Sequence, residues 1–412
     1  MKILFLTDWF PPYSAGGAEQ IVLNLANGFK ERGYEVFVIS TVQDKTKGND
    51  GQDGIYRVYV PHYHERWRAY RSLYRPLVAK KIEGIIKDIK PDIVHAHNIH
   101  YYLSYHCLKI AKKYCPKVFL TAHDVQLFHY GKLIEFVDYK SLLVPKNFNY
   151  RVSAWQQIRR YKKRYNPFRN IIIRYYLGYV DKIFAVSRAV KEALNQNGIR
   201  NVAVVHNGIN SEDWTIDLDE IKRFKQKYNL LAKKIVFFGG RLSFLKGGRQ
   251  IIQAMAEVVK EVPDAVLLLV GRKDKYIEEI SEVAQEKGVP LINTDWISGK
   301  ELVAAYWSSE VVVVPSVYLD PFPTVNLEAM ACKRPVIATC FGGSQELVVN
   351  GESGFVINPL DIKTTAKKIK LILEDETLAT KFGNNGFQRI KDHFTINHQI
   401  DRLLKFYLSS YD

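Results

Sequence analysis

Two acids eight positions apart follow a strand-like run in the second half of the chain. Asp320 stands in a proline-rich loop, and Glu328 lies beyond Pro323, a residue suited to the start of a helix. A carboxylate can accept hydrogen bonds from two vicinal hydroxyls of a sugar, and the first helical amides, at Thr324 and Val325, can cap a phosphate. An isolated acid pair is usually a solvated helix face. The apolar neighbours of Glu328 instead indicate partial burial, and buried acids need partners.

Two cations follow an earlier strand-like run and stand among glycines. Arg241 and Lys246 lie five positions apart, between Gly239-Gly240 and Gly247-Gly248. The planar fork of Arg and the point charge of Lys suit a diphosphate, whose negative charge grows as it leaves. The plainer interpretation is a pair of solvated surface cations, and the flanking glycines favour binding. The segment does not match the P-loop pattern Gly-x-x-x-x-Gly-Lys-Ser/Thr.

A further glycine pair, Gly16-Gly17, lies between a strand-like run and a helical stretch near the start of the chain. Glycines let the backbone approach a ligand closely, and the following helix offers free N–H groups to an anion. The segment is not Gly-x-Gly-x-x-Gly, so a dinucleotide fold of the dehydrogenase type is not indicated. Taken alone, the pair is better explained as a tight turn.

Three histidines, His95, His97 and His100, are spaced like metal ligands. No acid cluster completes a metal site around them, so structural or acceptor-binding roles are favoured. The four cysteines form no Cys-x-x-Cys pair and indicate reduced thiols in a cytoplasmic protein.

All these motifs follow strand-like runs that alternate with helical patterns. The runs are nearly continuous in Val, Ile, Leu and Phe, which predicts parallel sheets covered by helices on both faces. They cover residues 2–7, 34–40, 92–97, 117–123, 182–187 and 202–207 in the first half, and 234–240, 265–271, 311–316, 335–339 and 354–359 in the second. The length of 412 residues and the polar stretch near 208–232 predict two domains.

We therefore expect two doubly wound, Rossmann-like α/β domains, 1–208 and 209–412, facing across a cleft. The final helix, about 393–410, is a candidate to cross back to the first domain. Open parallel sheets bind ligands beyond the carboxyl ends of their strands, which is where the motifs lie.

The net charge of +16 is unevenly distributed. Residues 1–200 hold 33 Lys and Arg against 16 Asp and Glu, whereas residues 201–412 hold 26 against 27. The stretch 139–180 holds ten cations and ten aromatic residues without one acid, and is densest at Arg159-Arg160-Tyr161-Lys162-Lys163-Arg164-Tyr165. A solvated helix face is the plainer interpretation, but cations interleaved with aromatics also suit an anionic membrane or a nucleic acid. No apolar run approaches the ~20 residues that span a bilayer.

Taken together, the motifs resemble those of the retaining glycosyltransferases of family 4, which have the GT-B fold. The resemblance covers nearly the whole length, and the order and spacing of its hallmarks are specific. The hallmarks are Gly16-Gly17-Ala18-Glu19, Thr121-Ala122-His123-Asp124, His206-Asn207-Gly208-Ile209, Gly240-Arg241-Leu242 with Lys246-Gly247, Asp320 through Glu328, Pro335-Val336-Ile337-Ala338 and Gly342-Gly343-Ser344-Gln345-Glu346.

The resemblance implies a role for each site residue. In the family's pattern the second acid, here Glu328, binds the nucleotide ribose, and the first, here Asp320, contacts donor-sugar hydroxyls. The family's Arg and Lys, here Arg241 and Lys246, hold the diphosphate, together with the helix that begins near Thr324.

On the side of the first domain, the resemblance places Gly16 and Gly17 beside the diphosphate and the sugar, and His123 beside the donor sugar. Two residues depart from the pattern. Asp320 replaces the commoner Glu, which shortens the reach by one methylene, and Lys333 stands where the family often has Gly.

The function implied is transfer of a sugar, with retention, from a nucleotide sugar to a lipid-linked or saccharide acceptor in polysaccharide or glycolipid synthesis. UDP or GDP donors are favoured, and no metal and no nucleic acid are expected. The resemblance also favours an anionic membrane surface for residues 139–180, with the protein peripheral to the inner face of the cell membrane. Two alternatives stay open: a nucleotide-sugar epimerase of similar fold, and a basic RNA- or lipid-binding protein without catalysis.

Overall fold

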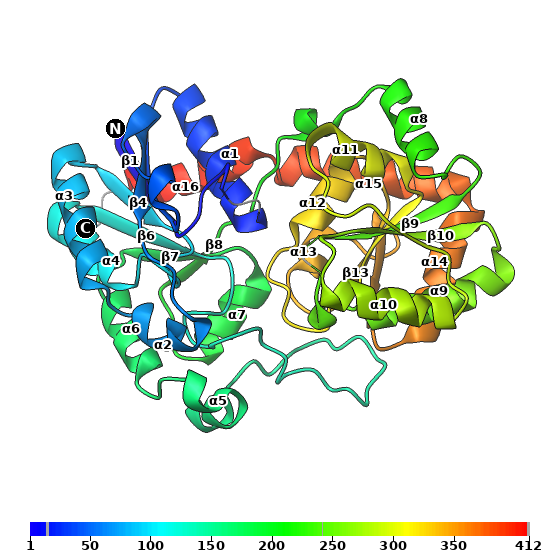
Figure 1. Ribbon diagram of the computed structural model, residues 1–412, viewed down its shortest axis with the longest axis horizontal. Coiled ribbons are helices and arrows are strands. Elements are labelled where there is room, and N and C mark those ends of the chain that lie inside the picture. Colours follow the sequence, from blue (N-terminus) through cyan, green and yellow to red (C-terminus); the bar gives the residue numbers. More distant parts are fainter. Residues whose placement is uncertain (14–15, 241, 410–412) are drawn as a thin grey trace. The chain divides into compact units, whose positions relative to one another are not determined.

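The chain forms two α/β units in the computed structural model, which describes residues 1–13, 16–240 and 242–409 (Figure 1). Unit 1 comprises Met1–Phe136, Asn149–Gly208 and the segment that begins at Ile396. Unit 2 comprises Val137–Phe148 and Ile209–Thr395.

Unit 1 is built on a sheet with the strand order β3-β4-β2-β1-β5-β6-β7-β8. Every neighbouring pair is parallel except β3 and β4, so seven strands run in parallel. The strands are β1 (Lys2–Leu6), β2 (Glu35–Val42), β3 (Asn49–Asp50), β4 (Ile55–Tyr59), β5 (Ile93–Ala96), β6 (Lys117–Ala122), β7 (Lys182–Ala185) and β8 (Val202–Val204).

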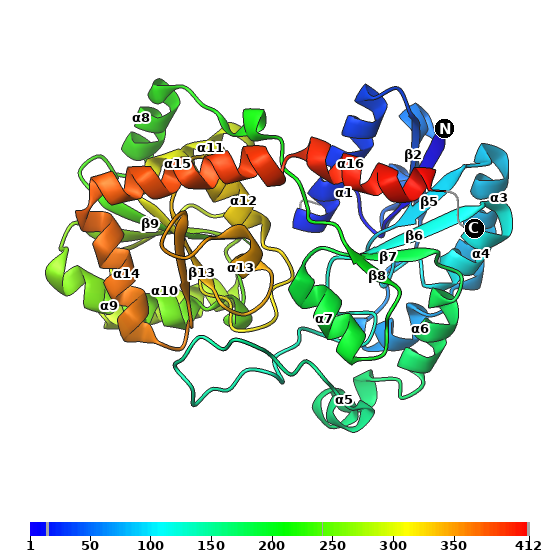
Figure 2. The same cartoon turned by 180° about the vertical axis from the view of Figure 1, so that it is seen from behind.

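The α-helices of unit 1 lie around this sheet, and α1 and α16 lie side by side on one face (Figures 1 and 2). Their apolar side chains share one core with those of β1, β2, β5, β6 and β7. The helices are α1 (Gly17–Glu31), α2 (Arg68–Arg71), α3 (Pro76–Ile89), α4 (His106–Tyr114), α5 (Ala154–Tyr161), α6 (Arg169–Leu177), α7 (Arg188–Gln196) and α16 (Ile396–Leu408).

Unit 2 is built on a fully parallel sheet with the order β11-β10-β9-β12-β13-β14. This is the 3-2-1-4-5-6 order of the doubly wound nucleotide-binding fold. The strands are β9 (Lys234–Gly239), β10 (Ala265–Val270), β11 (Leu291–Asn293), β12 (Val311–Val314), β13 (Val336–Thr339) and β14 (Gly354–Ile357).

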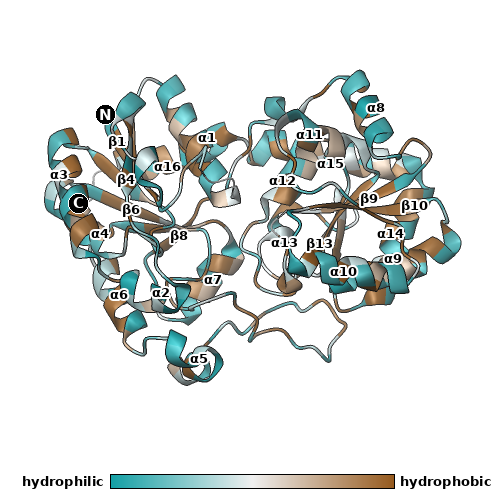
Figure 3. Cartoon of the chain, viewed as in Figure 1, coloured by the Kyte–Doolittle hydropathy of each residue, from teal (hydrophilic) through white to brown (hydrophobic). Residues whose placement is uncertain are grey.

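The α-helices of unit 2 cover both faces of its sheet. Val236 and Phe238 of β9 face a core shared with α9, α10 and α14, while Phe237 between them stacks on Tyr306 of α11 on the opposite face. Figure 3 shows apolar strands at the centre of each unit. The helices are α8 (Leu218–Lys227), α9 (Gly248–Glu261), α10 (Lys275–Glu286), α11 (Gly299–Ser308), α12 (Thr324–Ala331), α13 (Ser344–Leu347), α14 (Ile362–Glu374) and α15 (Glu376–His393).

The parallel sheets agree with the fold expected from the sequence, and three strands were missed. β3 and β11 are short, with two and three residues. The strand β4 has five residues, of which only Val58 is buried, so it lacks the continuous burial that identifies the central strands.

Residues 137–148 belong to unit 2, whereas the sequence predicts a first domain that comprises all of 1–208. The physical reason is a pair of hydrogen bonds: the Asn358 side-chain amide donates to the carbonyls of Ser141 and Leu143, at 3.0 and 2.9 Å. The basic stretch 139–180 is thereby divided between the two units. No helix among the described residues is long and apolar enough to cross a bilayer.

Candidate active site

In unit 2 the sequence motifs lie where the strand order changes direction. β9 and β12 are neighbours, but the chain leaves them toward opposite edges of the sheet. Such a switch point leaves a crevice beyond the carboxyl ends of the two strands, where doubly wound folds bind ligands. Lys246 follows β9, and Asp320 and Glu328 follow β12.

Lys246 and Asp320 form a buried ion pair. The Lys246 ammonium donates to Asp320 Oδ2 at 2.7 Å, and the Ser316 hydroxyl donates to the same oxygen at 2.6 Å. Asp320 is only 3% exposed. Burial, the largest single influence, would lower the pKa of Lys246, but Asp320 and the neighbouring Tyr318 together outweigh it, so the pKa is raised and the ammonium stays charged.

Two glycines allow the loops around this ion pair to approach each other closely. A Cβ on Gly247 would lie 2.1 Å from the carbonyl oxygen of Pro315, and a Cβ on Gly342 would lie 2.1 Å from that of Asp320. Both glycines also have positive φ, +85° and +108°. Only glycine meets both conditions, so these positions fix the loops that carry the ion pair.

Glu328 lies inside α12, which begins at Thr324 after Pro323, as the sequence predicts. The first amides of this helix, including that of Val325, have no acceptor within the helix and can bind an anion. The Tyr306 hydroxyl donates to Glu328 Oε2 at 2.6 Å. Burial raises the pKa of Glu328, and hydrogen bonds from Tyr306 and Thr324 oppose that rise.

Tyr306 is a site residue that sequence reasoning missed. It stacks on Phe237 with ring centroids 4.4 Å apart and packs edge-on against Trp214, which fixes the direction of its hydroxyl. In the sequence it lies in an apolar helix and is indistinguishable from a core residue.

Three further predicted site residues are Arg241, Gly16 and Gly17. Arg241 lies outside the described residues. Gly240, which precedes it, has a φ of +112° directly after β9. In unit 1, Gly16 is the extended N-cap of α1 and Gly17 is the first residue of that helix, so both stand at its amino end.

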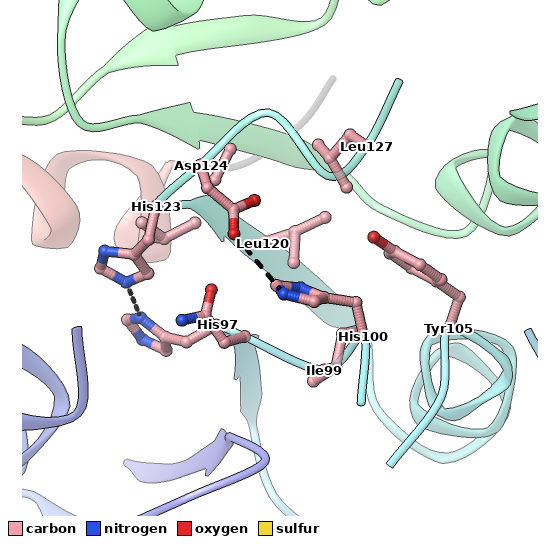
Figure 4. A pocket seen from close by; sticks show the side chains of 11 residues that line it. His97, Ile99, His100, Tyr105, Leu120, His123, Asp124 and Leu127 are labelled. Carbon is pink, nitrogen blue, oxygen red and sulfur yellow. Dashed lines mark hydrogen bonds and ion pairs between the residues drawn. The ribbon is translucent and has the colours of Figure 1, made fainter. Parts of the chain in front are cut away.

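In unit 1, a small hollow lies beyond the carboxyl ends of β5 and β6 (Figure 4). Two side-chain pairs line it. His97 Nδ1 and His123 Nε2 are 2.8 Å apart, and His100 Nε2 lies 3.5 Å from Asp124 Oδ2. The structure therefore joins His97 and His100 to His123 and Asp124 of the Thr121–Asp124 motif.

His95, the third spaced histidine, lies beneath this hollow in the core. Its Nδ1 is 2.5 Å from the Tyr407 hydroxyl of α16, and its Nε2 is 2.7 Å from Thr121 Oγ1. No group of three or more His, Cys, Asp or Glu side chains with metal-binding geometry occurs in the described ranges.

Burial keeps these histidines uncharged at neutral pH. It lowers the pKa of His95 to about 3, and it lowers those of His100 and His123 to about 4, where Asp124 opposes the change. The pKa of His97 lies well below its ordinary value, first through burial and then through the neighbouring imidazoles.

Asp8, two residues after the end of β1, fixes the loop that carries His100. Its carboxylate accepts three backbone N–H bonds, from Tyr101, Tyr102 and Leu103, each at 2.7 Å. The sequence shows only an isolated Asp after a strand. Its three partners lie more than 90 residues away, so nothing in the local pattern indicates this role.

Two family models match the chain and together cover most of it. "Glycosyl transferases group 1" matches residues 220–389, and "Glycosyltransferase Family 4" matches residues 15–213. The uncharacterized glycosyltransferase MJ1607 of Methanocaldococcus jannaschii is 26% identical over 96% of this chain and 95% of its own.

Solved structures share the fold. Sucrose-phosphate synthase from Thermosynechococcus elongatus superposes with a TM-score of 0.76 at 22% identity, over 98% of both chains. Anabaena Alr3699/HepE in complex with UDP superposes with a TM-score of 0.72 at 20% identity, over 98% of this chain and 99% of its own.

Proposed function

Because the chain belongs to the group 1 and family 4 glycosyltransferases, which have the GT-B fold, we propose that it transfers a sugar from a nucleoside-diphosphate sugar to an acceptor hydroxyl, with retention of configuration. The bond from the sugar C1 to the diphosphate breaks, and its electron pair leaves with the diphosphate. The acceptor oxygen forms the new bond to C1, and its proton passes to the departing phosphate.

The observation that supports this proposal most directly is the arrangement around the switch point of unit 2. The Lys246 ammonium and the free amides at the start of α12 supply positive charge for a diphosphate, and Glu328 supplies a carboxylate for a ribose. Preorganised positive groups stabilise the charge that develops on a leaving group. We propose that Arg241 adds to this set.

We assign the remaining roles by the same reasoning. Asp320 holds Lys246 in place at the sugar end of the donor, Gly16 and Gly17 allow close approach of the unit 1 backbone, and His123 contacts the donor sugar. In the proposal Lys246, Arg241 and the first amides of α12 hold the diphosphate without a divalent metal ion.

We propose UDP or GDP as the nucleotide. UDP is supported by the similar Anabaena structure, which contains it. For the acceptor we propose a lipid-linked or saccharide hydroxyl in cell-surface polysaccharide or glycolipid synthesis, and no nucleic acid.

A peripheral site on an anionic membrane fits the surface of unit 1. We define the basic-aromatic surface as the exposed residues of α5, α6 and the turn between them. It contains Trp155, Arg159, Arg160, Lys162, Lys163, Arg164, Phe168, Ile171, Arg174 and Tyr175. Figure 3 shows α5 as strongly hydrophilic. Arg169 is excluded because it is buried and donates to the backbone of Gln126.

The test is a thermal-shift screen of UDP-, GDP- and ADP-sugars, followed by incubation of the stabilising donor with and without acceptors. We expect stabilisation by one nucleotide class and release of its diphosphate only when an acceptor is present. Conversion of the sugar without acceptor would indicate an epimerase. Binding of RNA or vesicles with no shift by any nucleotide sugar would indicate a binding protein.

A further inference from the structure

The His97 ring lies between two other imidazoles in unit 1. Its centroid is 4.4 Å from that of His95 and 5.1 Å from that of His123, and its interplanar angle to His123 is 24°. Figure 4 shows the His97 and His123 rings joined at the edge of the hollow. The Nδ1 to Nε2 distance of 2.8 Å is that of a hydrogen bond, so one proton lies between these nitrogens.

The second nitrogen of each ring decides where that proton belongs. His97 Nε2 is buried and has no hydrogen-bond partner in the part of the chain that the structure describes. His123 is half-buried, and its only hydrogen bond within the described ranges is the one to His97. Its Nδ1 is therefore available to a ligand.

Two arrangements are possible for a pair of neutral rings. If His123 donated to His97, then His97 would carry its own proton on Nε2 and bury an N–H without an acceptor. If His97 donates through Nδ1, its buried Nε2 carries no proton, and only a lone pair on that nitrogen is left without a partner. Orphaned buried N–H groups are the rarer of the two in proteins. The second arrangement is therefore favoured, and it forces the His123 proton onto Nδ1.

We propose that His97 is a positioning residue that holds His123 as its Nδ1–H tautomer, so that His123 offers its ligand a neutral N–H donor. The ligand group is then an oxygen acceptor, such as a sugar hydroxyl or a phosphoryl oxygen. The proposal rests on the proposed function only for the identity of that ligand. The lowered pKa values of both rings agree with a neutral pair at pH 7.

The test is to read the two tautomers directly in the full chain. Long-range ¹H–¹⁵N correlation spectra of ¹⁵N-histidine-labelled protein distinguish protonated from unprotonated ring nitrogens. The signals are assigned by their loss in His97→Asn and His123→Gln. We expect both rings to be protonated at Nδ1. A His123 signal protonated at Nε2 would overturn the proposal, whatever the enzyme's activity.

Two variants separate positioning from a structural role. In His97→Asn the amide nitrogen can donate from nearly the place of Nδ1, so we expect the His123 tautomer to be kept. In His97→Leu the donor is lost, and we expect a mixture of His123 tautomers and a higher His123 pKa in a titration.

The same variants should differ in nucleotide-sugar affinity, with His97→Leu at least tenfold weaker than His97→Asn. An unchanged His123 tautomer in His97→Leu contradicts the proposal. If His97→Leu does not fold, the His123 tautomer measured in the wild-type protein still tests the proposal. If no nucleotide sugar binds any variant, the proposed function fails, while the tautomer measurement stands alone.

Discussion

At the scale of single residues, the carboxylate of Glu328 and the hydroxyl of Tyr306 act as one unit. Glu328→Ala should weaken nucleotide binding by about 1.5–3 kcal/mol, because the charge-assisted hydrogen bond that we propose to the ribose is lost. Tyr306→Phe keeps the stacked ring and removes only the hydroxyl that orients Oε2, so a smaller loss of about 0.5–1.5 kcal/mol is expected. Titration calorimetry with the nucleoside diphosphate measures both. Unchanged affinity in a folded Glu328→Ala protein would disprove the ribose contact.

The ion pair of Lys246 and Asp320 needs a double-mutant cycle. Lys246→Ala removes the cation that neutralises the buried Asp320 carboxylate, which should cost about 3–5 kcal/mol of stability as well as turnover. Adding Asp320→Asn should restore much of the stability but not the turnover, because the diphosphate still lacks the cation that we propose for it. Urea unfolding and kcat are measured on Lys246→Ala, on Asp320→Asn and on the double variant. Recovery of turnover in the double variant would assign Lys246 a structural role only.

At the scale of elements, the turn after α12 explains why the family often has glycine at the position of Lys333. This residue has a left-handed φ of +53°, where a side chain costs energy and glycine does not. Its ammonium over the Phe387 ring, 5.1 Å from the centroid, offsets part of the cost. Lys333→Gly should therefore raise the unfolding free energy of unit 2 by about 0.5–1 kcal/mol, without changing kcat. Lys333→Ala is the control, because it loses the same cation but keeps the strain. Equal effects of the two substitutions would contradict this explanation.

The buried histidines make unit 1 sensitive to acid. His95 and His100 have folded pKa values of about 3 and 4, against about 6.5 in an unfolded chain. Their stabilising contribution is present above pH 6.5 and is lost as the pH falls towards 4, by at most about 1.4 kcal/mol per pH unit for each histidine. His97 acts in the same sense. Burial raises the pKa of Asp8 to about 7, so protonation of Asp8 on acidification stabilises the fold and offsets the loss from one of these histidines.

Urea unfolding at pH 7.5, 6.0 and 5.0 measures this dependence. We expect the unfolding free energy to fall on acidification, with a shallower slope in His95→Phe, which removes one titrating ring from an aromatic environment. Stability that stays constant or rises between pH 7.5 and 5.0 would contradict the expectation.

The sequence predicts elements and motifs better than it predicts contacts between distant residues. The central strands are recognisable because both of their faces are buried, whereas β4, with one buried residue in five, is not. The start of α12 after Pro323 follows from local chemistry. The partners of the site residues do not: Tyr306 lies 22 positions from Glu328, and Tyr407 lies 312 positions from His95. Only the packed structure brings such pairs together.

At the scale of the whole molecule, the uneven charge predicts binding to anionic vesicles. Each cation near such a surface contributes up to about 1 kcal/mol, and aromatic side chains add interfacial contact. Changing Arg159, Arg160, Lys162, Lys163 and Arg164 to Gln should abolish co-sedimentation with anionic vesicles at low salt. Binding by the wild type should fall as salt rises, because the attraction is screened over roughly 8 Å at physiological ionic strength.

The matched control removes five exposed cations from unit 2. It changes Lys222, Lys287, Lys300, Lys363 and Lys367 to Gln. This control should still bind, because its net charge equals that of the first variant while its basic-aromatic surface is intact. Equal loss in both variants would show that only total charge matters, and no binding by the wild type would favour a water-soluble acceptor.

The return of α16 to unit 1 sets an order for folding during synthesis. Ile400, Leu403 and Tyr407 complete the core against which β1 and α1 pack, and Tyr407 also bonds His95. A ribosome makes these three residues only after all of unit 2. Unit 1 therefore keeps part of its apolar surface uncovered until α16 is made, whereas unit 2 can fold before that point. A released chain that ends at Thr395 should accordingly show a protease-resistant unit 2 joined to a protease-sensitive unit 1.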